Sequence, residues 1–332
     1  MDAVTLPAIE ELRDVARVVA LPMATRFRGV TVREALLLHG PEGWTEFSPF
    51  VEYDDAEAAA WLAAAIDFGW NPQPAPVRTE IGVNATVPAV AAADVAAVLA
   101  RFDGCRTAKV KVAERGQSLS DDLARVAAVR AVMGPEGRVR IDANGGWNLD
   151  EADRAIHALA DLDLEYVEQP CATVDELAEV RYRTKHLGVP IAADESVRKA
   201  TDPLAVARAG AADLIIVKAQ PLGGVAHALQ IVAAAGLPAV VSSALDTSIG
   251  LAMGAALAAA LPELDYDCGL GTASLFTMDV AAPPLVPRGG VLPVGRVEPD
   301  AALLDAAAAS PDRQAWWLAR LQRCHAALVA HG

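Results

Sequence analysis

From about residue 80 onward, short β-branched runs alternate with alanine-rich stretches of helical character. Eight such runs occur: EIGVNATV (80–87), TAKVKVA (107–113), RVRIDAN (138–144), LEYVEQP (164–170), VPIAADES (189–196), DLIIVKAQ (213–220), PAVVSSA (238–244) and YDCGLG (266–271). Because parallel neighbours need a crossover connection, this alternation predicts right-handed βαβ units. Eight strands with seven intervening helices predict an α/β fold, a (β/α)7β TIM-type barrel. An open doubly wound sheet is the alternative, but no G-x-G-x-x-G follows the first strand.

Polar residues at the ends of these runs keep the same interval. Asp142, Glu168, Asp194, Lys218 and Ser242 are separated by 26, 26, 24 and 24 residues. That interval is one β/α unit. If each residue ends its strand, all five face the same mouth of the barrel, where such folds place their chemistry.

Three of these strand-end residues are acids. Asp142 alone is explained by a turn, since Asp and Asn favour turns. Glu168 closes the apolar run YVEQP and Asp194 follows PIAA, where unpaired buried carboxylates are costly. Three acids on successive strand ends repel one another unless a cation lies between them. Oxygen ligands without His or Cys favour Mg²⁺ or Mn²⁺, and Asn144, on the same face as Asp142, is a candidate to support the ligands.

Lysines flank the three acids. Lys109 and Lys111 alternate with valines, so both amines share one face of their strand. Solvated lysines on an edge strand would explain them, but a barrel has no edge. A nearby cation and like charge would lower their pKa towards that of a usable general base. Lys218, on the other side of the acids, is either a counter-ion or a second amine facing the first across a substrate.

The last strands carry small polar residues. Ser242 and Ser243 are either ordinary strand-end hydroxyls or donors to a substrate carboxylate. Gly269 and Gly271, in CGLGTAS, let backbone approach a ligand closely, although turn formation explains them equally well.

Composition restricts the partners. A net charge of −15 and a pI near 4.8 argue against nucleic acid and anionic membranes. The four cysteines are scattered without a C-x-x-C pair, which indicates neither zinc nor disulfides and fits a reducing cytoplasm. The N-terminus lacks a signal-peptide pattern, and the longest apolar run, 249–261, is too short to span a bilayer. We expect a soluble cytoplasmic protein with no obligatory protein partner.

Lys-x-Lys, then Asp, Glu, Asp, then Lys on successive strands resembles the enolase superfamily in its muconate-lactonizing subgroup. The resemblance implies a Mg²⁺ ion on the three acids and a lysine base. It also implies an N-terminal α+β capping domain (1–75), a modified barrel (76–280) and a C-terminal segment (281–332) packed against both. Strand-like VARVVAL, VTVREALLL and WTEFSPF, followed by helical DDAEAAAWLAAAI, would build the cap.

Residues 22–50, with FRG, RE and GWTEFSPF, resemble the lid of the o-succinylbenzoate synthases of actinobacterial type. The implied reaction is dehydration of 2-succinyl-6-hydroxy-2,4-cyclohexadiene-1-carboxylate, a lyase step in menaquinone biosynthesis. By the same resemblance, Lys111 moves the protons, Lys109 neutralises the substrate carboxylate and Lys218 lies over the ring as a cation. Arg26 and Arg28 are expected to contact the succinyl end, and Ser242, Ser243 and Gly271 to bind substrate.

Two other functions stay open. An N-acylamino acid or dipeptide racemase would use the same metal and both lysines, so the barrel residues cannot separate it from a dehydratase. A non-catalytic metal-binding protein of the same fold would need only the acids, and the lysines speak against it.

Overall fold

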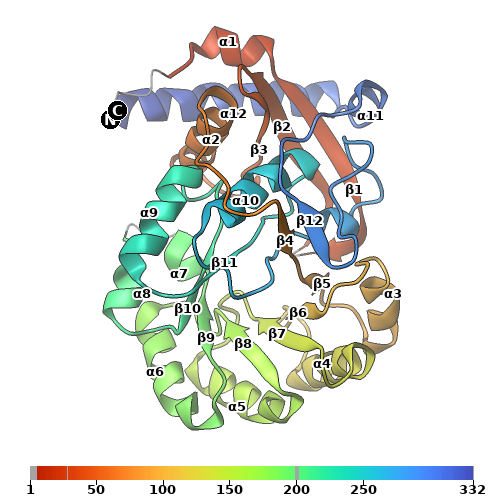
Figure 1. The fold of residues 1–332 in the computed structure, drawn as a ribbon, viewed down its shortest axis with the longest axis vertical. Helices are drawn as coiled ribbons and strands as arrows, with labels where there is room; N and C mark the ends of the chain where they lie inside the picture. The colour runs from red at the N-terminus through yellow and green to blue at the C-terminus, as the bar shows by residue number, and fades with distance from the viewer. Residues whose placement is uncertain (1–5, 28, 199–201, 332) are drawn as a thin grey trace.

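The computed structural model describes residues 6–27, 29–198 and 202–331. An antiparallel sheet with its helices caps one end of a curled parallel sheet, which is surrounded by further helices (Figure 1). The described residues therefore have the cap-on-barrel arrangement that the sequence predicted.

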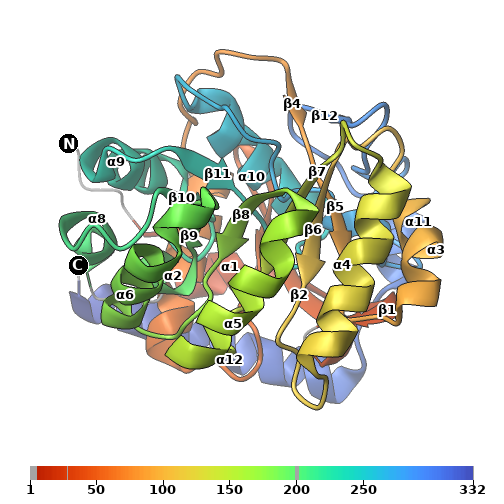
Figure 2. The same cartoon turned by 90° about the horizontal axis from the view of Figure 1, so that it is seen from below.

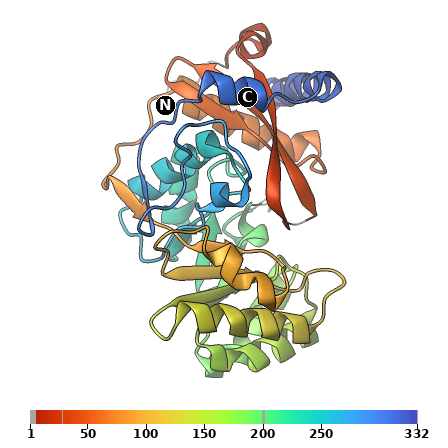
Figure 3. The ribbon, with the colours of Figure 1, turned by 90° about the vertical axis from the view of Figure 1, so that its right-hand side faces the viewer.

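The cap is a three-stranded sheet, formed by β1 (Arg17–Phe27), β2 (Val30–Gly40) and β3 (Gly43–Phe47) in that order. All three strand-like segments and the helical segment were predicted correctly. Helix α1 (Ile9–Asp14) precedes the sheet, and α2 (Asp55–Trp70) follows it. Asp54 begins α2 by accepting a hydrogen bond from the Glu57 amide at 2.8 Å. The long hairpin of β1 and β2 reaches towards the barrel (Figure 3).

Seven parallel strands form the barrel wall, in the order β11-β10-β9-β8-β7-β6-β5. They are β5 (Ala85–Val87), β6 (Thr107–Lys111), β7 (Arg138–Asp142), β8 (Leu164–Glu168), β9 (Ile191–Ala193), β10 (Leu214–Val217) and β11 (Ala239–Val241). Every neighbouring pair is also consecutive in sequence, as expected for a barrel built from successive βα units.

The first predicted strand is divided in two. Residues 80–82 form β4 (Glu80–Gly82), which pairs antiparallel with β12 (Val291–Pro293) outside the barrel wall. Only β5 joins the parallel sheet, through β6. The prediction of one continuous strand was therefore wrong, because the chain changes pairing partner at residues 83–84.

The eighth predicted strand is reduced to two bridging residues. Gly269 forms a parallel bridge with Ser242, and Cys268 forms one with Val83. These bridges join the β11 side of the sheet to the β5 side and close the barrel. A short turn of 3-10 helix, η4 (Thr272–Leu275), follows almost at once and leaves no room for a longer strand.

Helices surround the parallel strands when the molecule is seen from below (Figure 2). They are α3 (Val95–Leu99) with η1 (Ala92–Asp94), α4 (Leu119–Met133), α5 (Leu149–Leu159) with η2 (Ala160–Leu162), α6 (Val174–Thr184) with η3 (Lys185–Leu187), α7 (Glu195–Arg198) with α8 (Ala205–Arg208), α9 (Val225–Ala235) and α10 (Ser248–Ala260). Three successive helices, α4, α5 and α6, start at reciprocal capping boxes, formed by Ser118 with Asp121, Asn148 with Glu151 and Thr173 with Glu176. These boxes fix where each strand-end loop stops.

Helix α10 contains the long apolar run and is buried on nearly every side. It packs against β3 of the cap as well as against α9 and β11, which explains why it has no polar face. In the part of the chain that the structure describes, no helix is long and apolar enough to cross a membrane.

The C-terminal segment returns to the cap. Helix α12 (Pro311–His331) packs on α2, and β12 pairs with β4 beside the barrel. A short helix, α11 (Ala301–Ala306), lies between them in sequence. The domain boundaries at 75 and 280 stay a prediction.

Candidate active site

The strand-end acids and lysines meet at one mouth of the barrel. Lys111, Asp142 and Glu168 end β6, β7 and β8 and stand in register with one another across the sheet. Asp194 and Lys218 come directly after β9 and β10. In the strand order, the three acid-bearing strands lie between β6 and β10, so Lys111 and Lys218 flank the acids.

These charged side chains are buried and directly bonded to one another. Lys109 Nζ lies 3.0 Å from both carboxylate oxygens of Glu168 and 3.1 Å from Asp142 Oδ2. Lys111 Nζ donates to Asp142 and, at 2.6 Å, to Asn144 Oδ1. Lys218 Nζ lies 2.6 Å from Asp194 Oδ2. Each acid thus has a lysine partner. Asn144 holds Lys111 through its side-chain oxygen, and its backbone N–H donates to Asp142 Oδ1 at 3.0 Å.

Electrostatics at the mouth follow from this pairing. Burial and the charge of Asp142 raise the pKa of Glu168 to about 8. Burial opposes ionisation of Asp142 too, but Lys111 and Lys109 outweigh it and hold the pKa of Asp142 well below its ordinary value. Burial lowers the pKa of Lys109, yet Glu168 and Asp142 raise it further, so the net shift is upward. The two carboxylates beside this amine therefore set the direction of its pKa shift.

The three acids fit a divalent ion by their chemistry. Asp142, Glu168 and Asp194 are 0 to 1 % exposed and present only oxygen donors, the ligands that Mg²⁺ and Mn²⁺ prefer. Among residues 6–27, 29–198 and 202–331, no three acidic, histidine or cysteine side chains converge closely enough to hold an ion as they stand. Ammonium groups occupy oxygens of all three carboxylates, so ion binding requires those groups to withdraw.

Gln169 organises the loops that carry the second and third acids, and the sequence analysis missed it. Its backbone has a positive φ of 40°, directly after Glu168. Gln169 Oε1 accepts hydrogen bonds from the backbone N–H groups of Asp194 (2.9 Å) and Ser196 (3.2 Å). Gln169 Nε2 donates to the Ser196 hydroxyl at 2.7 Å. This amide therefore fixes the start of α7 and the position of Asp194.

Arg198, at the end of α7, was missed as well. It lines the cavity at the barrel mouth, and its Nε lies 3.1 Å from Asp194 Oδ1. It also donates to Glu195 Oε1 at 2.6 Å and to the Tyr53 hydroxyl of the cap at 3.2 Å. Arg198 thereby connects an acid of the site to the cap.

A narrow cavity opens among these residues, beneath the cap. It measures about 30 Å³, which is above the roughly 10 to 15 Å³ that one ordered water needs and well below the cavity of about 150 Å³ that binds benzene. Three cap residues line it, Phe27, Phe50 and Trp61. The barrel residues that line it are Thr86, Lys109, Lys111, Asp142, Asn144, Arg198, Lys218, Ser242, Ser243, Ala244, Leu245, Gly269 and Thr272. A ring-sized substrate can enter only if side chains draw back.

The predicted substrate-binding residues divide into three groups. Ser242 and Ser243 line the cavity, and Ser243 Oγ contacts Gly269 O at 2.8 Å. Gly271 does not line it, and a Cβ there would meet Asn84 O at 2.9 Å, so packing already requires a glycine at this position. Arg26 is exposed on β1 and does not line the cavity, although its neighbour Phe27 does. Arg28 lies outside the described residues.

The EFSPF segment contacts the barrel mainly through buried polar groups. Glu46 Oε2 accepts hydrogen bonds from Thr247 N (3.0 Å), Thr247 Oγ1 (2.6 Å) and Gly250 N (3.1 Å), at the start of α10. Ser48 N donates to Gln220 Oε1 at 3.3 Å. Phe50 alone of this segment reaches the cavity.

Glu46 gives the cap a pH-dependent contribution to stability. Burial raises the pKa of Glu46 to about 7, helped by the charge of Asp246 and opposed by Arg33. The stability from its proton is complete below the ordinary pKa of 4.5 and is lost as pH rises through about 7. Glu46→Gln keeps an acceptor towards Thr247 and an uncharged group towards Ser48. As pH rises from 5 to 8, we expect the free energy of unfolding of this variant to increase relative to that of the parent by on the order of 2 kcal/mol. One pKa unit corresponds to about 1.4 kcal/mol.

The measurement is the free energy of unfolding in urea at several pH values. Arg33 and Asp246 remain in both proteins, and the difference includes the effect that the Glu46 charge has on the titration of Asp246. Glu34→Gln is the control, since Arg313 and Trp317 overcome the effect of burial and lower the pKa of Glu34. That variant should gain nothing over the same interval. A constant difference between parent and Glu46→Gln would contradict the assignment.

Comparison with known proteins adds to the geometry. Residues 90–301 match the enolase C-terminal domain-like family, and residues 18–69 match the enolase N-terminal domain-like family. A protein of Mycobacterium tuberculosis named o-succinylbenzoate synthase is 57% identical over 325 residues, 98% of each chain. A protein of the same name from Mycolicibacterium smegmatis is 56% identical over 322 residues, 97% of this chain and 98% of that one.

Solved structures show the same fold. A muconate lactonizing enzyme from Pseudomonas fluorescens, complexed with muconolactone, superposes with a TM-score of 0.76 at 22% identity, covering 89% of this chain and 98% of that one. The L-Ala-D/L-Glu epimerase of Bacillus subtilis gives 0.71 at 23% identity, covering 86% and 96%. At these identities the likeness concerns the fold alone.

Proposed function

This chain belongs to the o-succinylbenzoate synthase family within the enolase superfamily, and we propose that its buried lysines and acids carry out the dehydration. The enzyme is a hydro-lyase of menaquinone biosynthesis, which converts 2-succinyl-6-hydroxy-2,4-cyclohexadiene-1-carboxylate to o-succinylbenzoate. Because the family is one of enzymes, the alternative of a non-catalytic metal-binding protein is not proposed again.

The placement of Lys111 and Lys218 on either side of the three acids supports the proposal most strongly. Lys111, held by Asp142 and Asn144, removes the proton next to the substrate carboxylate. Once protonated, the same amine delivers that proton to the departing hydroxyl, so a single base serves both steps. Its Nζ already faces into the cavity, 5.3 Å from the centre of the Phe27 ring.

The remaining charged residues stabilise the substrate. Lys109 neutralises the substrate carboxylate, and Lys218 lies over the ring as a fixed cation. Asp142, Glu168 and Asp194 would hold Mg²⁺, or Mn²⁺ in its place. Such an ion would supply positive charge beside the substrate carboxylate, whose negative charge grows as the α proton leaves. Ser242, Ser243 and Gly271 of the barrel and Arg26 and Arg28 of the cap remain the proposed contacts for the rest of the substrate.

A second activity, racemisation of N-acylamino acids, is compatible with the two flanking lysines. Racemisation needs an acid or base on each face of the α-carbon, and Lys111 and Lys218 both line the cavity. We propose it as a side activity that the same substrate pocket permits.

The setting we propose is the cytoplasm. All four cysteines lie among the described residues and are unpaired, which suits a reducing compartment. The strongly acidic surface suits a small-molecule enzyme without nucleic acid or membrane partners.

The direct test is turnover of the cyclohexadiene carboxylate by the purified chain with Mg²⁺. We expect loss of one water and growth of aromatic absorbance, abolished when a chelator removes the ion. N-succinyl amino acids, tested in parallel, measure any racemisation. Racemisation without dehydration would overturn the proposal.

A further inference from the structure

Arg33 of β2 is buried at the junction between the cap and the barrel, 3 % exposed. Its Nε donates to the backbone carbonyl of Leu245 at 3.1 Å, and its Nη2 donates to the carbonyl of Ser48. The guanidinium also stacks over the Phe50 ring, 4.5 Å from the ring centre. A single side chain thus contacts both the cap segment and the barrel loop.

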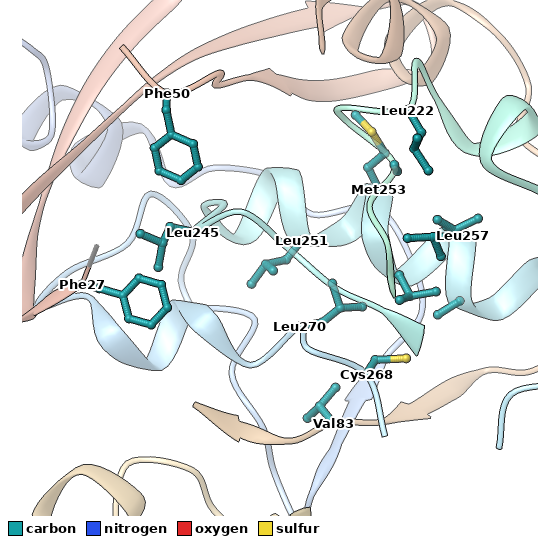
Figure 4. Packing of buried hydrophobic residues seen from close by; sticks show 14 of the residues in the cluster. Phe27, Phe50, Val83, Leu222, Leu245, Leu251, Met253, Leu257, Cys268 and Leu270 are labelled. Carbon is teal, nitrogen blue, oxygen red and sulfur yellow. The ribbon is translucent and has the colours of Figure 1, made fainter. Parts of the chain in front are cut away.

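Two of these partners are apolar walls of the cavity. Phe50 from the cap and Leu245 from the loop after β11 both line it, together with Phe27. Figure 4 shows the side chains of Phe27, Phe50 and Leu245 grouped at one end of the apolar cluster. Arg33 does not line the cavity; it lies behind the two walls and joins them.

Leu245 needs such support because of its backbone. Its φ is +61°, in the left-handed region that is unfavourable for a residue with a Cβ. The hydrogen bond from Arg33 to the Leu245 carbonyl holds the peptide that follows this strained residue. Without it, the loop is free to relax and move the Leu245 side chain.

Glu46 anchors the same loop two residues later. It accepts hydrogen bonds from both the amide and the hydroxyl of Thr247. Gln220, two residues after Lys218, meets Ser48 of the same cap segment. The cap therefore holds the loop at Leu245 and at Thr247, and also the chain beyond Lys218.

We propose that Arg33 is a positioning residue for the dehydration, acting through Phe50 and Leu245, with Glu46 securing the loop on which Leu245 stands. The inference rests on the proposed function, because it assumes that a substrate ring occupies the space between these walls. A ring displaced by about 1 Å from the proton-transferring amine can lose on the order of 10²-fold in rate.

Arg33→Lys is the first test. Lysine keeps the positive charge near Glu46 and Asp246 but lacks the planar fork that reaches two carbonyls and stacks on Phe50. We expect kcat to fall at least about tenfold, and the affinity for the product o-succinylbenzoate, measured by calorimetry, to fall as well.

Arg78→Lys is the matched control. Arg78 also donates to backbone carbonyls at α10, those of Ala258 (2.5 Å) and Leu261 (2.7 Å), but at the far end of the helix from the cavity. We expect the melting temperature of the Arg78→Lys variant to fall, as that of the Arg33→Lys variant does. Its kcat and product affinity should stay unchanged. Equal kinetics in the two lysine variants would reduce Arg33 to a structural contact.

A double-mutant cycle shows whether the effect passes through Leu245. In a Leu245→Ala background the wall is already lost. The change in log(kcat/KM) caused by Arg33→Lys should therefore be less than half as large in this background as in the parent. Arg78→Lys should combine additively with Leu245→Ala. If Arg33→Lys does not fold, Arg33→Gln, which retains a donor for the Leu245 carbonyl, replaces it in the cycle. Additive Arg33 and Leu245 effects in an active parent overturn this inference alone, whereas a parent without dehydratase activity overturns the proposed function.

Discussion

Glu168→Gln is expected to weaken Mg²⁺ binding on the order of 10²-fold or more, since loss of a group that merely supports a metal ligand already costs 10- to 100-fold. The amide keeps the shape of the side chain but removes its charge. It also replaces one of the two oxygens that now accept from the Lys109 amine, both at 3.0 Å, with an NH₂ group. Dehydration should fall in parallel with occupancy. Calorimetric titration with Mg²⁺ measures the affinity directly and does not depend on turnover.

Glu176→Gln is the matched control for this prediction. Glu176 belongs to the capping box of α6, the helix that follows β8, and it is half-buried. Its replacement changes the net charge of the protein by the same amount, but at the start of a helix outside the site. We expect Mg²⁺ affinity and turnover to stay at parent values, with circular dichroism confirming the fold of both variants. Unchanged Mg²⁺ affinity in Glu168→Gln would remove the three-acid assignment.

The barrel could be predicted because its signal repeats. Strands recur at one β/α interval, and polar residues at their ends, such as Asp142, Glu168 and Asp194, recur with them. Parallel pairing then brings equivalent positions to one edge. No long-range contact had to be guessed, since each strand pairs with the next in sequence.

The departures came where pairing is not sequential. EIGVNATV has the composition of one strand, but residues 80–82 pair with β12, some 210 residues later. YDCGLG closes the barrel through two residues only, Cys268 and Gly269. Composition and periodicity carry no information on such distant partners.

The cap motif was recognised, but the prediction concentrated on its charged side chains and left out the aromatic ones that line the cavity. Phe27 of FRG and Phe50 of EFSPF line the cavity, while Arg26 beside Phe27 is exposed. Successive strand residues point to opposite faces, so a one-residue error in register exchanges a cavity residue for a solvent residue. Gln169 and Arg198 were missed because their roles depend on turns after the strands, which alternation does not describe.

Lys218→Arg is expected to retain measurable dehydratase activity, whereas Lys111→Arg should lose it on the order of 10³-fold, the usual contribution of a general base. The dehydration that we propose removes proton and hydroxide from one face, so only Lys111 has to move protons. Arginine at position 218 keeps the charge but cannot readily deprotonate. Lys218 Nζ now lies 2.6 Å from Asp194 Oδ2, and a guanidinium can preserve that contact. Its larger size should still reduce the rate about 10- to 100-fold by displacing the ring.

Racemisation separates the two lysines in the opposite way. It needs proton transfer on both faces, so Lys218→Arg and Lys111→Arg should each abolish it. Turnover of the cyclohexadiene carboxylate and of N-succinyl amino acids, with α-deuterium exchange followed in D₂O, measures both activities in each variant. Lys185→Arg, at an exposed lysine beside Tyr182, should leave both unchanged. If the Lys218 and Lys111 variants lose dehydration equally and completely, Lys218 does more than supply a charge, and proton transfer on both faces must then be part of the dehydration itself.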